Sequence, residues 1–538
     1  MTGHRALLQR RHLLQLGAAA LAAPGLAAPR IAQAASQRVL KFVPQADLTV
    51  LDPIWTTATV TRNHAFLVFD TLYGLDTDFR PHPQMAEGHV VEADGRVWNI
   101  RLRPGLVFHD GTPVLARDCV ASLQRWGKRD AFGQSLMAVT EALEAPDDRT
   151  IRFRLKRPFP LLVHALAKST ATVPVIMPER LAKTDAFTQV PEIVGSGPYR
   201  FVPGERLTGA RVVYEKFAGY KPRENGEPSW TSGPKQAHFE RVEWNILPDA
   251  ATAAAALQSG EVDWWESLSP DLAPMLRRDR NLQFQPQDPT GSIGILRFNH
   301  LQPPFDNPAI RRAVLGAVNQ ADYMSAVAGS DTSLWRTGVG VFTPGTPMAT
   351  DVGMEVLNAP RDMEKVKRDL AAAGYNGEKV VILGVSDLAV LKAETDVGAD
   401  MFQRMGMNVD FQTADWGTVV TRHANRGPVS QGGWNVHYTG FNGIDFVNPV
   451  GHLPLRGNGD GAWFGWPRSP RLEELRDAWM FSESPEQQKS IAVEMQRQAW
   501  QDVPYIPLGQ YFVLQGYRRD LAGMMPAFPV FWNVRRGA

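Results

Sequence analysis

The sequence predicts a mixed α/β protein with more than one lobe, and three observations support this class. The chain has 538 residues, whereas one compact domain usually has roughly 100–200 residues. Segments with the two-residue alternation of strands are interspersed with segments of helical spacing along the chain. After about residue 298 the helices become longer, and a buried strand candidate at 380–385 follows them. This change indicates a separate α/β lobe.

The first third of the chain combines short strands and helices with many turns. An apolar run at 39–43 predicts a strand, and Val97–Leu102 alternates between two faces as a strand does. Pro104-Gly105 and Asp110-Gly111 are turn dipeptides that frame a further short strand. The elements expected here are strands at 39–43, 97–102, 106–109 and 150–155, and helices at 64–72 and 116–126.

Helix boundaries are clearer in the rest of the chain. Asn307-Pro308 favours a helix start, because Asn caps the first turn and Pro fits the first helical position. Ser484-Pro485-Glu486-Gln487 has the spacing of a capping box and predicts a helix that runs to Trp500. An apolar stripe at 363–373 stops at Gly374. The other elements expected are strands at 240–247, 408–412 and 506–514 and a helix at 250–257.

The first 34 residues have the features of an export signal. Arg10 and Arg11 directly precede an uncharged run, rich in Ala and Leu, from Leu13 to about Ala28. The signal ends at Ala32-Gln33-Ala34, a small-x-small pattern suited to a signal peptidase. The arginine pair favours the twin-arginine (Tat) route, with an ordinary Sec signal as the alternative. We therefore expect a mature chain, from residue 35, in a bacterial periplasm or at the cell exterior.

Charge and cysteine content narrow the function further. The leader holds four of the 57 basic residues and no acidic ones, so the remaining chain has 53 basic and 56 acidic residues, a net charge of −3. This balance argues against nucleic acid or an anionic membrane as the main partner. Cys119 is the one cysteine. An exported chain with one cysteine has no internal disulfide and depends on its hydrophobic core.

Motifs for catalysis are not recognisable in the sequence. It has no His-Glu-x-x-His, no paired cysteines, no Gly-x-Ser-x-Gly elbow and no Walker-type phosphate loop. Ser232-Gly233-Pro234-Lys235 has Ser-x-x-Lys spacing, but that chemistry requires a helix, which Gly and Pro prevent here. The 12 histidines are scattered without metal-site spacing. We expect no catalytic residues, no metal and no cofactor, and therefore no enzyme.

Six segments follow one another along nearly the whole mature chain. They are Trp98–Trp126 with its Leu-Arg-Pro-Gly-Leu-x-Phe-His-Asp-Gly-Thr-Pro core, Val194–Phe201, Ala256–Asp263, Phe298–Ala313, Leu370–Tyr375 and Asp502–Leu508. Each segment has a structural interpretation, such as close backbone approach at Gly195 and Gly197, where the chain re-enters a sheet. Together and in this order they resemble the family 5 extracellular solute-binding proteins of ABC importers, a family that includes dipeptide, oligopeptide and nickel binders.

The resemblance implies a two-lobed periplasmic-binding-protein fold with a hinge and an extra subdomain in the first lobe. The limits expected are 35–290 for the first lobe, about 85–195 for its inserted subdomain, 291–505 for the second lobe and 506–538 for the return. Such lobes close on a ligand held between them. The implied function is capture of a peptide-like or other small organic solute and its delivery to an ABC permease in the inner membrane. A monomer is expected.

The stretch 433–445 contains the first ligand contacts that we expect. In the dipeptide-binding branch this region resembles Trp-Thr-Gly-Asp-Asn-Gly-Asp-Pro, whose Asp after the Gly pairs with the peptide's α-ammonium group. Aligned on the Gly-x-Asn-Gly spacing, this chain has Phe441 there, and an apolar ring cannot replace a carboxylate facing an ammonium ion. Asp445 is the alternative partner. The contacts expected are Trp55, Ser292, Trp416, Trp434, Tyr438, Phe441 and Asp445, with Trp463 and Trp466 as further candidates.

Two alternative functions stay open at the level of sequence. A receptor of the same fold for nickel or another metal chelate would require clustered histidines in the cleft. An exported hydrolase would require a nucleophile–base pair within hydrogen-bond reach. Neither pattern is recognisable in the sequence, so binding and delivery of a solute are the favoured function.

Overall fold

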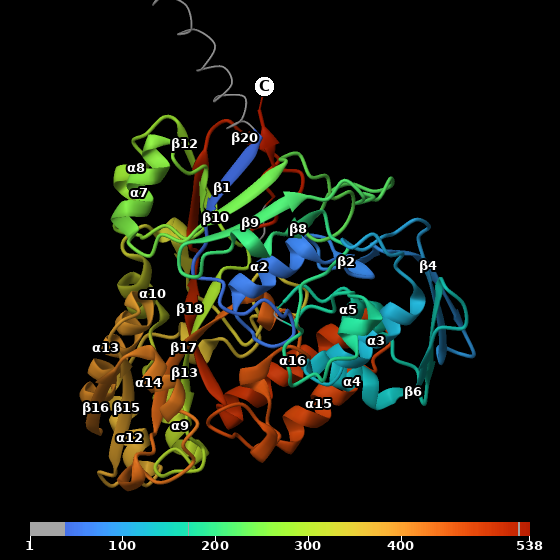
Figure 1. Cartoon of the computed structure of the whole chain (residues 1–538). Coiled ribbons are helices and arrows are strands. Elements are labelled where there is room, and N and C mark those ends of the chain that lie inside the picture. The colour runs from blue at the N-terminus through green and yellow to red at the C-terminus, as the bar shows by residue number, and fades with distance from the viewer. Residues whose placement is uncertain (1–37, 171, 526–527, 538) are drawn as a thin grey trace, which may run out of the picture.

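A computed structural model describes residues 38–170, 172–525 and 528–537. The export signal expected at 1–34 lies outside these residues. In Figure 1 a seven-stranded sheet lies at the top, a six-stranded sheet lies toward the lower left and a four-stranded sheet lies at the right. Helices cover these sheets. The α/β class with two lobes and an additional subdomain is therefore confirmed.

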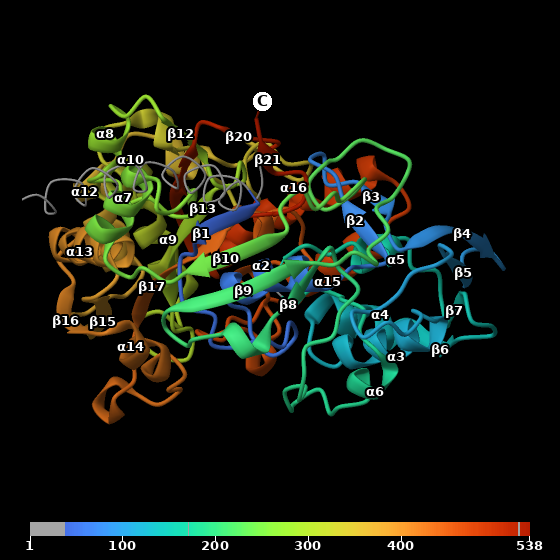
Figure 2. The same ribbon diagram turned by 45° about the horizontal axis from the view of Figure 1, so that its top comes forward.

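The seven-stranded sheet is the core of the first lobe. β1 (Val39–Val43) pairs in parallel with β10 (Arg241–Asn245) on one side and with β11 (Trp264–Trp265) on the other. The strand order is β12-β19-β11-β1-β10-β9-β8, and Figure 2 shows β1, β10 and β9 side by side. The other elements of this lobe are β8 (Tyr199–Phe201), β9 (Arg211–Lys216), β12 (Leu282–Pro286), β19 (Leu514–Arg518), α2 (Thr59–Val68), α7 (Ala250–Ser259) and α8 (Ala273–Leu276).

Aromatic side chains fill the core against this sheet. The ring of Phe42 on β1 lies 5.5 Å from Trp244, 4.9 Å from Trp264 and 5.0 Å from Phe531, measured between centroids. Trp244 and Trp264 belong to the two strands beside β1, so alternate residues of three neighbouring strands meet on one face. Phe531 joins the C-terminal segment to this core. The tryptophans here pack the first lobe rather than a ligand.

The inserted subdomain has its own four-stranded sheet, β4-β5-β7-β6. It contacts the second lobe, because the guanidinium of Arg157 lies 3.5 Å from the ring centroid of Phe481, and Phe159 lies 5.7 Å from the same ring. The elements of the subdomain are β4 (Ala86–Glu92), β5 (Val97–Leu102), α3 (Ala116–Trp126), α4 (Ala131–Val139), β6 (Thr140–Glu144), β7 (Thr150–Leu155), α5 (Leu162–Leu166) and α6 (Glu179–Ala182). Two pairs of short strands complete the first lobe: β2 (Tyr73–Leu75) with β3 (Pro81–Pro83), and β20 (Leu521–Ala522) with β21 (Arg535–Arg536).

The six-stranded sheet is the core of the second lobe. β13 (Ser292–Phe298) lies at its centre and pairs antiparallel with β17 (Val436–Asn442) and β18 (Tyr505–Tyr511). The order is β14-β18-β13-β17-β15-β16. The other elements of this lobe are β14 (Trp335–Arg336), β15 (Lys379–Val385), β16 (Asn408–Ala414), α9 (Pro308–Ala317), α10 (Gln320–Ala328), α11 (Glu355–Asn358), α12 (Met363–Ala372), α13 (Ala389–Arg404), α14 (Trp416–Arg422), α15 (Pro470–Met480) and α16 (Pro485–Asp502).

Many of the predicted elements have the expected bounds. The strands at 97–102 and 150–155 and the helix at 116–126 are found as predicted. The Asn307 side chain accepts a hydrogen bond of 2.9 Å from the backbone N–H of Ala309, so it caps α9 as expected. Ser484 accepts one of 3.2 Å from the N–H of Gln487 at the start of α16.

Three predicted elements differ from the structure. Residues 106–109 are not a strand but part of a tight turn, in which the N–H of Phe108 bonds to Thr112 O at 2.8 Å. The helix expected at 64–72 is α2, which ends at Val68, where an extended Phe69 follows. The strand expected at 506–514 is two strands, because β18 belongs to the second sheet and β19 to the first. The chain therefore passes from the second sheet to the first between Tyr511 and Leu514.

The two crossings between the sheets run beside each other. The N–H of Gln287, between β12 and β13, donates to Val513 O at 2.8 Å, between β18 and β19. Both crossings are short loops between strands, and hinges consist of a few loop or element-terminal residues. Separately, among the described residues no helix is long and apolar enough to span a lipid bilayer.

Candidate functional site

A cleft of about 940 Å³ lies between the two lobes. Its volume falls in the range of ligand sites in proteins, roughly 300–1,000 Å³. Both lobes and the inserted subdomain contribute side chains to it. Those used below are Gln45, Arg62, Arg129, Asp130, Lys168 and Ser267 from the first lobe and subdomain, and Ser292, Leu388, Trp416, Phe441, Asp445, Trp463 and Tyr511 from the second lobe.

Strand ends position the wall that the second lobe contributes. Ser292, the first residue of β13, stands opposite Asn442 at the end of β17 and opposite Tyr511 at the end of β18. β15 runs parallel to β16 and β17, so the carboxyl ends of these three strands share an edge. The chain that leaves β15 brings Leu388 to the cleft, and the chain that leaves β16 brings Trp416.

Aromatic rings make this wall largely apolar. The rings of Phe441 and Trp463 meet edge to face, 5.4 Å apart. Trp416 opens α14, and its N–H donates to Asp387 Oδ1 at 2.9 Å, which fixes the start of the helix at the cleft. Partly exposed aromatic rings of this kind stack against planar or apolar parts of organic ligands.

Cations dominate the opposite wall. Arg129 donates to Trp55 O at 3.0 Å, and its guanidinium lies 5.5 Å from the Trp55 ring and 4.9 Å from the Phe187 ring. Lys168 forms a 2.8 Å ion pair with Asp130, which also caps α4 through the N–H groups of Phe132 and Gly133. Carbonyl and ring contacts therefore hold Arg129 at the rim without neutralising its charge.

Arg62 places a third cation at the cleft, from the buried helix α2, and is itself only 5% exposed. Its side chain packs on Phe528, 4.0 Å from the ring centroid, and its Nε has no hydrogen-bond partner among the described residues. Burial lowers the pKa of the guanidinium, while Asp288, Asp445 and Glu266 oppose this shift because they favour the charged form. An acidic neighbourhood thus keeps a nearly buried cation at the site.

Asp445 provides an acid from the second lobe. It lies in the short 3₁₀ turn η4 (Gly443–Phe446) after β17, and the turn packs tightly because a Cβ on Gly443 would lie 1.8 Å from Thr290 O. Burial raises the pKa of Asp445 to about 6, although Lys168 and Arg62 favour its charged form. A carboxylate from one lobe is therefore close enough to cations of the other to interact with them.

The structure brings four of the seven predicted contacts to the cleft: Ser292, Trp416, Phe441 and Asp445. Trp55 is not among its lining residues and instead contacts Arg129, as described above. Trp463, a further candidate, lines the cleft, whereas Trp466 is buried. These positions make contact with a ligand possible for five of the aromatic and polar candidates.

Trp434 and Tyr438 are corrections, because both side chains are fully buried and do not line the cleft. Tyr438 stacks on Tyr323 of α10, 6.3 Å away, under α13. Side chains of a strand alternate between its two faces, so Tyr438 turns into the lobe while Thr439 and Phe441 turn toward the cleft. Trp434 donates from Nε1 to His423 O at 3.0 Å inside the same lobe.

Sequence reasoning missed the three cations. Arg129 and Lys168 follow helices without any distinctive motif, so the sequence carries no signal for them. Arg62 lies in a helix whose residues from Val60 to Val68 are all buried. This burial is decided by the tertiary structure, so the sequence carries no signal for Arg62 either. Among the described residues, no group of three or more His, Cys, Asp or Glu side chains is arranged to hold a metal ion.

Two sheet-cored lobes that enclose a ligand-sized cleft define a binding protein of the periplasmic type. The chain belongs to the bacterial extracellular solute-binding proteins, family 5, whose model matches residues 80–450. Members of this family are binding proteins of transporters. The resemblance inferred from the six segments is therefore confirmed.

Curated relatives match along the whole chain. A probable peptide ABC transporter periplasmic-binding protein of Sinorhizobium fredii is 35% identical over 98% of this chain and 99% of its own. A glutathione-binding protein of Pectobacterium atrosepticum is 26% identical over 96% of both chains.

Solved structures show the same fold. The periplasmic binding protein AgaA of A. tumefaciens, in complex with agropinic acid, has a TM-score of 0.76 at 21% identity and covers 93% of this chain and 99% of its own. DppA of Helicobacter pylori, in complex with the peptide STSA, has a TM-score of 0.75 at 20% identity and covers 94% of this chain and 100% of its own.

Proposed function

We propose that this protein captures a zwitterionic, peptide-like or other small amino-acid-derived solute in the interlobe cleft and delivers it to an ABC permease. The relatives support this class, because their names refer to peptides and glutathione and a structural neighbour was solved with agropinic acid. We also propose export by the twin-arginine signal, action in the periplasm and a monomeric state.

One observation carries the proposal: opposite charges line the two walls of the cleft. Arg62, Arg129 and Lys168 come from the first lobe and its subdomain, and Asp445 comes from the second lobe. A ligand carboxylate suits the first wall and a ligand ammonium group suits the second. The aromatic wall beside Asp445, formed by Phe441 and Trp463, encloses the apolar part between these ends.

Closure of the lobes completes such a site. The crossings at Gln287 and Val513 provide the hinge, and the contacts of Arg157 and Phe159 with Phe481 join the subdomain to the second lobe. A ligand that bridges the two walls makes its full set of contacts only when they are close together, so binding favours the closed state. We propose that the first lobe comprises the segments that build the seven-stranded sheet and the second lobe those that build the six-stranded sheet.

Native mass spectrometry of protein purified from its host tests the function directly. A bound solute with both ammonium and carboxylate groups is the expected result. When this solute is added back to protein from which it was removed, it should raise the melting temperature by mass action. It should also lower the radius of gyration that X-ray scattering measures. A solute that is released chemically altered, or a radius of gyration unchanged by a tight-binding solute, would contradict the proposal.

Asp445→Asn should weaken binding of that solute about 30-fold or more, because a charge partner is lost from a partly desolvated site. The wild-type affinity should also fall as the pH drops through about 6, the pKa of Asp445 in the folded protein, since the protonated carboxyl carries no charge. The variant should lack this dependence. Calorimetry at pH 7.5 and pH 5 measures both effects. Asp460→Asn, at an exposed position outside the cleft lining, is the control, and unchanged affinity of Asp445→Asn would exclude this contact.

Phe441→Asp should increase the affinity for ligands with a free ammonium group. The ring of Phe441 lines the cleft, so a carboxylate there would face the ligand as the aligned Asp does in the dipeptide-binding branch. Phe441→Asn is the matched control, because Asn has nearly the same shape as Asp but no charge. Calorimetry with a set of dipeptides measures the effect, and no gain over the Asn variant would mean that the alignment of this loop is wrong.

A further inference from the structure

A second cavity, of about 440 Å³, lies at the carboxyl ends of three parallel strands of the first sheet. Its walls are formed by the residues that come directly after these strands. They are Pro44 and Gln45 after β1, Ile246 and Leu247 after β10, and Ser267 and Leu268 after β11. β1 lies between β10 and β11, and the chain passes from β10 through α7 to β11 on the other side of β1. Open α/β sheets bind ligands at such reversals of strand order.

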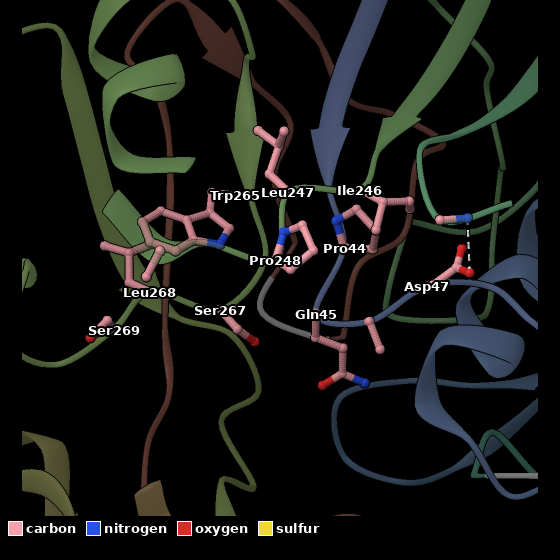
Figure 3. A pocket seen from close by; sticks show the side chains of 13 residues that line it. Pro44, Gln45, Asp47, Ile246, Leu247, Pro248, Trp265, Ser267, Leu268 and Ser269 are labelled. Carbon is pink, nitrogen blue, oxygen red and sulfur yellow. Dashed lines mark hydrogen bonds between the residues drawn. The ribbon is translucent and has the colours of Figure 1, made fainter. Parts of the chain in front are cut away.

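The surface of this cavity is mostly apolar. Figure 3 shows Trp265 and Leu268 on one side of Pro44 and Pro248, and Ile246 on the other side. Trp265 and Leu268 are almost completely buried. The cavity therefore has a fixed apolar interior that solvent reaches through its mouth.

Charged groups at the cavity disfavour an anion. Asp47 is the one charged residue among the described residues that line it, and its Oδ2 accepts a 3.1 Å hydrogen bond from the N–H of Gly209. α7 begins beside the cavity, but Asp249 caps it by accepting from the N–H of Thr252 at 2.7 Å. The positive end of the helix is thus already neutralised. Figure 3 shows Asp47 apart from Trp265 and Leu268, so the part of the cavity beside these two residues suits an uncharged aliphatic or aromatic group.

The cavity adjoins the interlobe cleft, because Gln45 and Ser267 line both. Buried Glu266 holds the loops that line both spaces. One of its carboxylate oxygens accepts a 2.7 Å hydrogen bond from the N–H of Gln45, and its own N–H donates to Val43 O at 3.0 Å. Its other oxygen accepts from Asn63 at 2.9 Å and from Gln287 at 2.7 Å. These bonds fix the loops after β1 and β11, so both cavities keep their position relative to each other.

We propose that this cavity is an annex of the ligand site and receives an aliphatic or aromatic side chain of the solute whose charged groups lie in the cleft. The inference rests on the proposed function, since the same ligand must enter the cleft. It narrows the solute class to peptide-like molecules with at least one sizeable apolar side chain. The shared residues, the apolar lining and the volume are the observations that support it.

Calorimetry on the full mature chain tests the annex with two probes. The first is benzyl alcohol, an uncharged aromatic molecule without the charged groups of the solute, and its loss in the annex-blocking variants assigns its binding to the annex. The second is a set of dipeptides in which one residue is Ala and the other is Gly, Ala, norvaline, Leu or Phe, in both orders. The blocking variants are Ala46→Phe and Ser269→Phe, whose positions line the annex and not the cleft. Ala210→Phe, at an exposed position beside the annex residue Gly209, is the matched control.

The wild type and the control should bind one benzyl alcohol, and both blocking variants should lose it. In one dipeptide order the affinity should rise about fourfold for each methylene added, and this rise should disappear in the blocking variants while the Gly-containing peptide still binds. No uptake of benzyl alcohol by the wild type, or a rise that persists in both blocking variants, would overturn the inference. If no dipeptide binds the wild type, the proposed function fails, and the inference fails with it, whereas a flat series with tight binding refutes the annex alone.

Discussion

Lys235→Met should lower the free energy of unfolding by about 3–5 kcal/mol, the effect of removing one partner from a buried ion pair. Lys235 Nζ lies 2.7 Å from Asp70 Oδ1, and neither side chain is more than 1% exposed. Methionine has a similar volume, so the loss reports the uncompensated carboxylate rather than a cavity. Among the described residues, the Asp70 side chain then keeps only the N–H of Thr71 and the hydroxyl of Tyr220 as hydrogen-bond donors, each at 3.0 Å. Urea denaturation followed by tryptophan fluorescence measures the change.

Lys183→Met is the matched control for this experiment. Its partner, Glu179, lies 2.8 Å away, but the lysine side chain is 68% exposed. Exposed pairs of this kind contribute about 0–1 kcal/mol. Equal denaturation midpoints for the two variants would refute the assigned role of Lys235. The ion pair also gives the lysine of the Ser-x-x-Lys segment at 232–235 a structural role, because its amine contacts Asp70.

Gly195→Ala is expected to destabilise the first lobe by about 1–3 kcal/mol or more, the usual range for overpacking. A Cβ at this position would lie 2.0 Å from Val68 O and 2.7 Å from Val68 C. These are backbone atoms at the end of α2, so no side-chain rotation relieves the clash. The neighbouring Gly197 donates its N–H to the same carbonyl oxygen at 2.8 Å. Either the strand entry or the helix end must move.

Gly204→Ala is the control, because a Cβ there meets no atom within 4 Å. Its effect should stay within about 0.5 kcal/mol. Thermal unfolding followed by circular dichroism compares the two variants with the wild type. If Gly195→Ala and Gly204→Ala have the same melting temperature, the close approach of the two backbones is not rigid. The prediction that Gly195 permits close backbone approach at the sheet is confirmed by the geometry.

Local signals explain which parts of the fold were predictable. Val97–Leu102 and Ala116–Trp126 have periodicities that depend on neighbouring residues alone, and both were found with the expected bounds. The cap at Asn307 needs only the next two residues. The segment 506–514 failed because its apolar run is continuous while the chain crosses between two sheets. A crossing of this kind leaves no mark in hydrophobicity.

The candidate site was predictable only in part. Phe441 and Asp445 were found through the family resemblance, and both lie at the cleft. Tyr438 was wrongly expected there, because residues three apart in a strand lie on opposite faces, and the face of Tyr438 is the one that α13 covers. The cations Arg62, Arg129 and Lys168 were missed, since each lies far from the 433–445 stretch in sequence.

The sequence by itself determined the family, the α/β class, most helix starts and the glycine-dependent turns, because these follow from neighbouring residues. The tertiary structure alone decided which side chains meet across the cleft, where the chain returns to the first sheet and that an apolar cavity adjoins the site. The physical reason is that strand ends from two sheets bring together residues hundreds of positions apart. Their burial then depends on what packs over them.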